Sequence, residues 1–434
     1  MKPRSSRYRW FVVAVFFAFM LLHQSDRLLI GPLTTPIMET FGITESKMGL
    51  VSTGALLVGA ILYPIWGYLY DRYARSKLLA LASAIWGATT WLNALAPTYP
   101  AFLVTRASTG IDDSSYPGIY SLISDYFGPT MRGKVYGILQ LSQPMGYMVG
   151  LLVATLLGGI IGWRGVFYIT GSLGLVLAVV IFFGVKETPR GSSEPEMEGL
   201  EQVGVYRFDR NTALGLFRKR SLLLLFAQGF VGVFPWNVIS FWFFRYLETE
   251  RGYSSSEVLM TMAPAILVLS SGYFIGGAIG DYLFKRTPRG RLITAMVGVI
   301  SGAVLFAITL SVPNSNQGLF LAMLLAAAVF IPFASTNVIS TVYDITLPEV
   351  RSTALSIQYF IENIGAALSP LMAGIIAEAY NLGTAFLVIC TSAWVLGTIF
   401  LAFTAYLAPK DIAVLRAQMR QRAEDELERS AQGA

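Results

Sequence analysis

Charged residues are scarce in this 434-residue chain: Asp, Glu, Lys and Arg together make up 13%, while 54% of the residues are hydrophobic. A soluble protein needs roughly 25% charged residues to give its surface enough contact with water. This scarcity excludes an ordinary soluble domain. The apolar runs between the charged patches are long enough to cross a bilayer, which takes about 20 residues in a helix.

Cysteine and histidine occur once each, as Cys390 and His23. A single cysteine excludes an intramolecular disulfide, and Cys390 stands in an apolar run typical of a small buried hydrophobe. Without a cluster of His and Cys ligands we expect no metal and no cofactor. No nucleophile and base motif or phosphate loop is present, so we expect no enzyme.

The apolar runs predict twelve transmembrane helices and hence an all-α integral membrane protein. The predicted spans are 10–38, 46–70, 78–96, 100–124, 132–161, 165–185, 219–247, 256–284, 290–311, 317–341, 350–378 and 382–408. The first run follows a basic arm but continues without a small-residue cleavage site, so it is interpreted as a permanent helix.

Lysine and arginine collect at one face of these spans, whereas the opposite loops 94–100, 312–317 and 380–383 are nearly uncharged. The positive-inside rule places the basic face, with both termini, in the cytoplasm of an inner membrane. The formal net charge of +6 therefore reflects a bilayer partner, and we exclude nucleic acid. We expect a monomer.

The chain divides into two halves that repeat. Residues 1–185 form an N-terminal six-helix bundle, 186–218 a solvated cytoplasmic connector, 219–408 a C-terminal six-helix bundle, and 409–434 a short, charged, solvated tail helix. Asp, Pro and Arg recur in register in 125–132 and 344–351, and Gly67 to Asp71 recurs as Gly277 to Asp281. Two related bundles around a midplane cavity are the architecture of alternating access.

The segment GYLYDRYARSK, from Gly67 to Lys77, resembles the signature loop between the second and third helices of the major facilitator superfamily. The resemblance implies the major facilitator fold of two pseudo-symmetric bundles. It also implies a gate in which the acid of this loop meets the positive end of a helix in the other half, where a carboxylate is stabilised. The residues expected to gate are Gly67, Asp71, Arg72, Arg75, Arg106, Asp125, Arg132, Asp281, Asp344 and Arg351.

Within that family the N-terminal half is similar to the spinster branch, with Asp26-Arg27 in the first span and Gly110 to Tyr116 in the fourth. Where the spinster pattern has glycine and glutamate, this chain has Asp112 and Asp113. The anion:cation symporter branch is the second choice. The first resemblance implies lysolipid, sphingoid or other amphipathic cargo, and the second a sugar acid or similar carboxylate.

Charged residues inside a span are costly and usually functional. Asp26 and the pair Asp112 and Asp113 each lie about 12 residues from the outer ends of their spans, about 18 Å deep at 1.5 Å per residue. Arg27 can then be neutralised by Asp113 or Asp112, because a lone buried arginine would be uncompensated. We hypothesise that protonation of Asp26, or of the aspartate pair, releases Arg27, which then binds an anionic substrate group or lets the halves rock. A static ion pair that fixes helix packing is the alternative.

His23 lies one turn before Asp26 and Arg27, so it either tunes the coupling or is a hydrogen-bonded structural histidine. The resemblance gives Arg106 a conformational or proton-coupling role, with snorkelling to the interface as the alternative. Further polar and aromatic side chains at helical spacing are expected to bind substrate together with Arg27: Gln140, Gln143, Tyr147, Trp236, Asn237, Gln358, Tyr359 and Glu362.

These observations predict a proton-coupled secondary transporter that moves a small amphipathic or anionic organic molecule by alternating access. An organic-anion or sugar-acid proton symporter is the first alternative. A membrane receptor or scaffold that kept the fold without transporting is the second.

Overall fold

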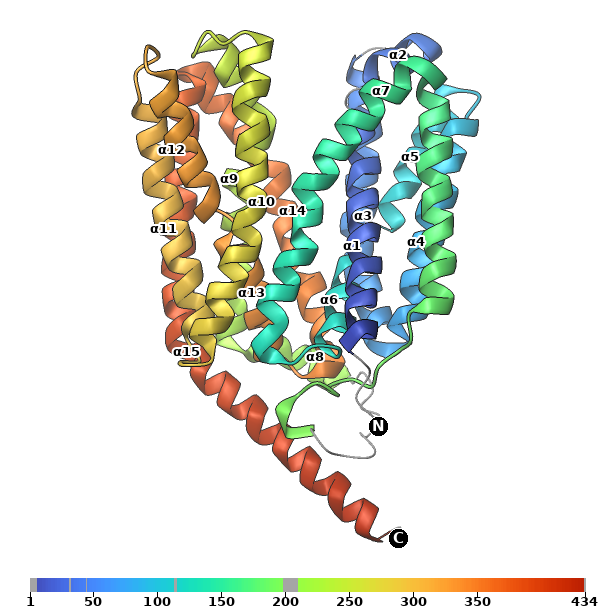
Figure 1. Cartoon of the computed structure of the whole chain (residues 1–434), viewed down its shortest axis with the longest axis vertical. Helices are drawn as coiled ribbons and strands as arrows, with labels where there is room; N and C mark the ends of the chain where they lie inside the picture. The colour runs from blue at the N-terminus through green and yellow to red at the C-terminus, as the bar shows by residue number, and fades with distance from the viewer. Residues whose placement is uncertain (1–5, 31–32, 44, 113–114, 198–209, 433–434) are drawn as a thin grey trace.

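The computed structural model describes residues 6–30, 33–43, 45–112, 115–197 and 210–432. Helices account for nearly all of this chain and form two bundles (Figure 1). The first holds α1 (Ser6–Leu29), α2 (Thr34–Phe41), α3 (Glu45–Arg72), α4 (Arg75–Leu95), α5 (Tyr99–Ser108), η1 (Thr109–Ile111), α6 (Tyr116–Ser124) and α7 (Pro129–Gly184). The second holds α9 (Arg220–Thr249), α10 (Ser255–Phe284), α11 (Gly290–Ser311), α12 (Gln317–Phe330), α13 (Phe333–Asp344), α14 (Arg351–Ala379) and α15 (Leu382–Gln432). Short pieces connect them: η3 (Pro195–Met197), α8 (Arg210–Gly215), η4 (Leu216–Arg218) and η5 (Pro348–Val350).

Ten helical segments of the described chain are long and apolar enough to cross a membrane. The remaining two predicted crossings correspond to α3 and to α5 with α6. Neither α5 nor α6 is long enough to cross alone, because the chain leaves the α-helix between them. The predicted all-α membrane fold is confirmed.

Four spans differ locally from their predicted form. The span 100–124 is broken between η1 and α6, and the span 317–341 is broken where α12 ends and α13 begins, at Pro332. Pro332 ends α12, because proline lacks an N–H and its ring clashes with the preceding turn. The two spans after Pro129 run together within α7, where Gly162, at φ 70°, turns the chain in a single residue.

The tail is not a separate solvated helix. It continues α15 through Pro409 to Gln432, and it buries Leu415, Met419 and Ala423 against Leu347. The predicted solvation is therefore wrong for this face of the tail. Apolar residues four apart in a charged helix form a stripe that needs a partner, and this spacing was the missed signal.

Both chain ends lie at the same end of the molecule, which we call the terminal face (Figure 1). The ribbons of the two bundles meet there and draw apart toward the opposite end. Glycines allow this meeting: a Cβ on Gly277 of α10 would lie 2.2 Å from the carbonyl oxygen of Gly133 in α7. The backbones can therefore cross only if no side chain intervenes.

Candidate functional site

Asp26 of α1 is buried inside the N-terminal bundle, with 2% of its surface exposed. Its Oδ1 accepts a hydrogen bond from Thr170 Oγ1 of α7 at 2.7 Å, and its Oδ2 accepts one from Thr90 Oγ1 of α4 at 3.1 Å. Arg106 Nη1 of α5 lies 3.6 Å from the same Oδ2. Four helices thus converge on one carboxylate, and a guanidinium balances its charge where water is excluded.

Arg106 is the cation of this pair, which differs from the expectation that centred the charge cluster on Arg27. Its side chain is 4% exposed, and Nη2 donates to the carbonyl oxygen of Arg27 at 3.3 Å. Burial contradicts the snorkelling alternative. Adjacent residues of a helix point about 100° apart, so Asp26 and Arg27 meet different neighbours.

His23 and Asp112 form a second buried pair, with His23 Nε2 2.6 Å from Asp112 Oδ2. The other ring nitrogen of His23 lies 3.1 Å from the hydroxyl of Tyr116, and the ring stacks on Phe19 with centroids 5.7 Å apart. An imidazole and a carboxylate at this distance can share or exchange one proton. This hydrogen-bonded environment agrees with the interpretation of His23 as a structural histidine.

Arg27 is half-buried and makes further interactions. Asp113, which the resemblance favoured as its partner, lies outside the described residues. Asp112 ends η1, at the break between α5 and α6. The aspartate that replaces the glycine of the spinster pattern is thus the one that meets His23.

The expected polar residues of the C-terminal bundle lie on α9 and α14. Gln358 Nε2 donates to Glu362 Oε1 at 2.9 Å, and Glu362 packs against Gly229 of α9. Asn237 is occupied within its own helix, donating to the carbonyl oxygen of Val233. Trp236 is 43% exposed on the surface of the protein.

Two residues that were expected to bind substrate instead contact the opposite bundle. Gln140 Oε1 of α7 accepts a hydrogen bond from Ser335 Oγ of α13 at 2.6 Å. Tyr359 of α14 meets Tyr63 of α3 edge-on, with centroids 5.8 Å apart. Gln143 and Tyr147, further along α7, remain half-buried.

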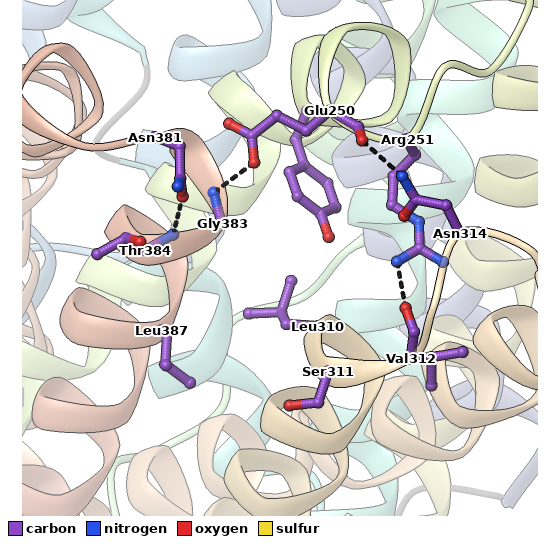
Figure 2. Close-up of a pocket in the computed structure, with 11 residues that line it drawn as sticks. Glu250, Arg251, Leu310, Ser311, Val312, Asn314, Asn381, Gly383, Thr384 and Leu387 are labelled. Atoms are coloured by element: carbon purple, nitrogen blue, oxygen red, sulfur yellow. Dashed lines mark hydrogen bonds between the residues drawn. The ribbon is translucent and has the colours of Figure 1, made fainter.

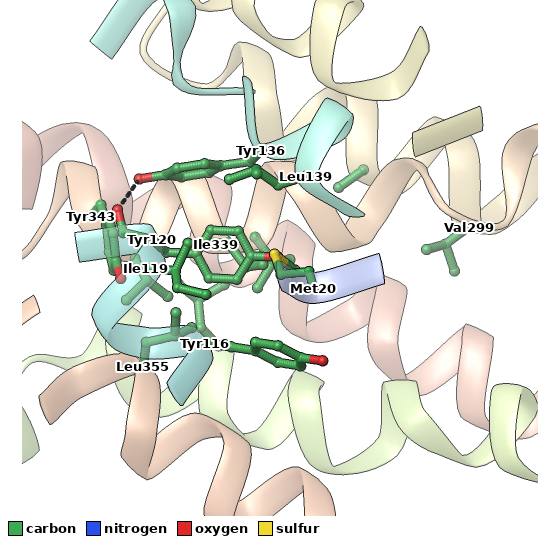
Figure 3. Close-up of a cluster of buried hydrophobic side chains, with 14 of the residues drawn as sticks. Met20, Tyr116, Ile119, Tyr120, Tyr136, Leu139, Val299, Ile339, Tyr343 and Leu355 are labelled. Atoms are coloured by element: carbon green, nitrogen blue, oxygen red, sulfur yellow. Dashed lines mark hydrogen bonds between the residues drawn. The ribbon is translucent and has the colours of Figure 1, made fainter. Parts of the chain in front are cut away.

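Buried tyrosines from α6, α7 and α13 close the seam between the bundles (Figure 3). The Tyr136 hydroxyl donates to the carbonyl oxygen of Tyr120 at 3.1 Å, and the Tyr343 hydroxyl donates to that of Pro117 at 3.2 Å. The Tyr136 ring stands at right angles to that of Tyr343, 5.9 Å between centroids. Sequence alone gives no signal for a role of these tyrosines, because aromatic residues in spans are usually packing residues.

Two carboxylates latch the bundles together at the terminal face, and they do so reciprocally. Asp71 of α3 accepts from the backbone N–H groups of Ser352 and Thr353, at 3.1 and 2.6 Å, in the first turn of α14. Asp281 of α10 accepts from the backbone N–H groups of residues 133 and 134, at 3.1 and 2.9 Å, near the start of α7. Each carboxylate thus meets the positive end of a helix from the other bundle.

Near these two carboxylates, each bundle also contains an equivalent arginine–aspartate ion pair. Arg75 binds Asp125 at 2.5 Å in the first bundle, and Arg291 binds Asp344 in the second. Between the bundles, Arg132 Nη1 lies 3.7 Å from Asp344 and Arg351 Nη1 lies 3.9 Å from Asp125. Arg72, by contrast, is exposed and donates to the Tyr68 hydroxyl.

Residues of the connector are also bound at the terminal face. The polar composition of the connector predicts a solvated segment instead. Glu187 accepts from Arg75 Nε at 2.8 Å, and Glu194 is 1% exposed. Burial alone would raise the pKa of Glu194, but Arg132, Arg351 and Arg416 outweigh it and hold the pKa well below its ordinary value. For residues 186–197, a solvated connector was thus the wrong expectation, because backbone and carboxylates are bound to the bundles.

A cavity of about 320 Å³ opens at the far end of the C-terminal bundle, away from the predicted residues (Figure 2). Its polar side chains tie helix ends together. Glu250 accepts from the backbone N–H groups of Leu382 and Gly383, and Arg251 donates to the carbonyl oxygen of Val312. We therefore interpret it as a structural joint of α9, α11 and α15.

Two helical bundles, buried ion pairs within spans and reciprocal latches between halves are the architecture of a membrane transporter built from two related halves. The sequence profile of the Major Facilitator Superfamily matches residues 15–370, and the chain belongs to this family.

Within this family the chain is similar to several individual proteins. The chain is 29% identical over 391 residues to protein spinster of Drosophila melanogaster, covering 86% of this chain and 62% of that protein. It is 26% identical to the cis,cis-muconate transport protein of Acinetobacter baylyi, covering 92% of this chain and 95% of that one. The predicted resemblance to the spinster branch is confirmed, and the relatives are transporters, not enzymes.

Solved structures share the fold. A bacterial homologue of the human lysosomal transporter Spinster, in an inward-facing and unoccupied conformation, superposes with a TM-score of 0.58 at 21% identity over 95% of this chain and 98% of that one. A human organic anion transporter superposes with a TM-score of 0.69 at 17% identity over 92% and 100%.

Proposed function

We propose that this chain is a proton-coupled secondary transporter that moves an organic molecule with an anionic group and an apolar body. The observation that carries the proposal is the pair of buried acid sites inside the N-terminal bundle, Asp26 with Arg106 and Asp112 with His23. Ionisable groups within the hydrocarbon region are costly, so a protein without a use for them would have apolar residues there. We further propose that both termini lie in the cytoplasm.

Protonation changes the charge of both buried pairs and so weakens or alters the contacts that each pair makes. A proton on Asp26 weakens its attraction to Arg106, whose Nη2 also reaches the backbone at Arg27. A proton shared between His23 and Asp112 changes the charge at the break between α5 and α6. Both changes reach the segment that carries Arg27, which we propose binds the anionic group of the cargo.

For the cargo, we propose a lysolipid or sphingoid-like molecule first, because the chain resembles spinster proteins in sequence. A sugar acid or dicarboxylate is the second candidate. It is favoured by relatives named for muconate and hexuronate transport, such as the hexuronate transporter of Bacillus subtilis, 24% identical over 85% of this chain and 87% of that one.

Uptake into proteoliposomes with an imposed pH gradient tests the proposal, with lysolipids, muconate and hexuronates as the panel. We expect gradient-driven uptake in the wild type and its loss in Asp26→Asn and Asp112→Asn. Counterflow of the same compound at equal pH should survive in both variants, because exchange requires binding and rocking but no net proton movement. Arg27→Ala should lose both activities.

Asp425→Asn, which neutralises an exposed carboxylate of the tail, is the matched control. Asp113→Asn tests the residue that the resemblance favoured. Gradient-independent uptake that Asp26→Asn and Asp112→Asn leave unchanged would refute proton coupling and leave the ion pairs as packing elements. Specific binding of a panel compound without any flux would favour the receptor alternative.

A further inference from the structure

Glu194 of the connector lies between the two bundles and contacts both. Its Oε1 accepts from Arg132 Nη2 at 2.6 Å and from Arg351 Nη2 at 2.6 Å. These arginines are the equivalent residues of the two sequence repeats, one at the start of α7 and one at the start of α14. A single oxygen thus accepts a hydrogen bond from each half at the terminal face.

The tail completes the site from a third direction. Arg416 of α15 donates to Glu194 Oε2 at 2.6 Å and to Glu196 Oε2 at 3.0 Å. Six residues further along, Arg422 binds Glu349 in the turn before α14, at 2.6 Å. Leu415 and Met419 bury their apolar stripe on the same side. The carboxylate is thereby held by three cations that belong to the first bundle, the second bundle and the tail.

We infer that Glu194 is a third gate carboxylate, which with the docked tail locks the terminal face in its closed arrangement. When the bundles rock apart at this face, Arg132 and Arg351 move with different halves, so one oxygen cannot remain 2.6 Å from both. Opening therefore breaks at least one charge-assisted hydrogen bond in a site from which water is excluded. Asp71 and Asp281 each join one helix start of the other bundle, whereas Glu194 joins both bundles and the tail.

The lock adds a regulatory element that the gating loop alone lacks. Through Arg416 the tail reaches Glu194, whose Oε1 accepts hydrogen bonds from an arginine of each bundle. A change that undocks the tail weakens the closed state without altering any residue inside the membrane. The connector and the tail, which carry no transmembrane chemistry, thus set how often the terminal face opens.

Distances between spin labels on the two halves test this inference and do not depend on cargo or proton coupling. Labels at Tyr73→Cys and Arg289→Cys, both exposed on the terminal face, are introduced into a Cys390→Ala background and measured by double electron–electron resonance. We expect Arg416→Ala and Glu194→Gln each to raise the ratio of the long-distance to the short-distance population by about tenfold, as loss of a charge-assisted hydrogen bond predicts.

The control is Arg420→Ala, which removes the same charge from an exposed position one turn further along the tail. Its distribution should match that of the parent. Arg416→Ala leaves Glu194 with two arginines, so it does not strand a buried charge and guards against misfolding of Glu194→Gln. A distribution in Arg416→Ala identical to that of Arg420→Ala would overturn the role of the tail, and an unchanged Glu194→Gln would overturn the lock itself.

Discussion

Gly67 of α3 sets how closely the two bundles can approach at the terminal face. A Cβ at this position would lie 2.4 Å from Ser356 Oγ and 2.6 Å from Ser356 Cβ of α14. Overpacking costs about 1–3 kcal/mol, and here the cost falls only on the closed arrangement. We expect Gly67→Ala to lengthen the spin-label distances defined above. Gly318→Ala, where a Cβ meets nothing within 4 Å, serves as the control. Equal distributions for the two variants would show that the seam adjusts without opening.

Among the helices, the N-terminus of α15 is capped by the carboxylate of Glu250, which directly follows α9. Glu250 accepts from the N–H groups of Leu382 at 2.5 Å and Gly383 at 3.0 Å, which lie in the first turn of α15. A charge that caps a helix N-terminus contributes about 1–2 kcal/mol. We expect Glu250→Ala to lower the Tm of the purified protein in detergent. Glu248→Ala, two residues earlier and exposed, should leave the Tm unchanged. Identical unfolding curves would contradict the capping role.

For the whole molecule, the contribution of Glu194 to closure of the terminal face does not depend on pH near neutrality. Burial raises the pKa of Glu194, but the three arginines lower it by a larger amount. The pKa of Glu194 in the folded protein therefore lies well below the ordinary value. A carboxylate with a lowered folded pKa stabilises the fold above its ordinary pKa of about 4.3 and loses that contribution only as the pH falls through the folded value. The effect of Glu194→Gln on the spin-label distances should therefore be equal at about pH 8 and about pH 6. A smaller effect at the lower pH would mean that Glu194 takes up protons during the cycle.

Part of this architecture could be predicted because hydrophobic length and charge asymmetry are local properties of the chain. Twelve spans and the duplicated halves follow from segments whose residues are close in sequence, whereas the placing of Asp71 at a helix start of the other bundle came from the resemblance of its loop to a family signature. The spans 100–124 and 317–341 were predicted as continuous, because helix breaks at Asp112 and Pro332 leave the apolar pattern intact.

The sequence by itself determined the membrane environment, the repeat and the residues that carry charge within it. Only the tertiary structure decided which charges meet. Arg106 lies beside Asp26, His23 meets Asp112, and Glu194 joins residues 132, 351 and 416. The physical reason is that an ion pair depends on side-chain direction and on the packing of helices far apart in sequence. Composition shows that a buried charge needs a partner, and the fold selects that partner.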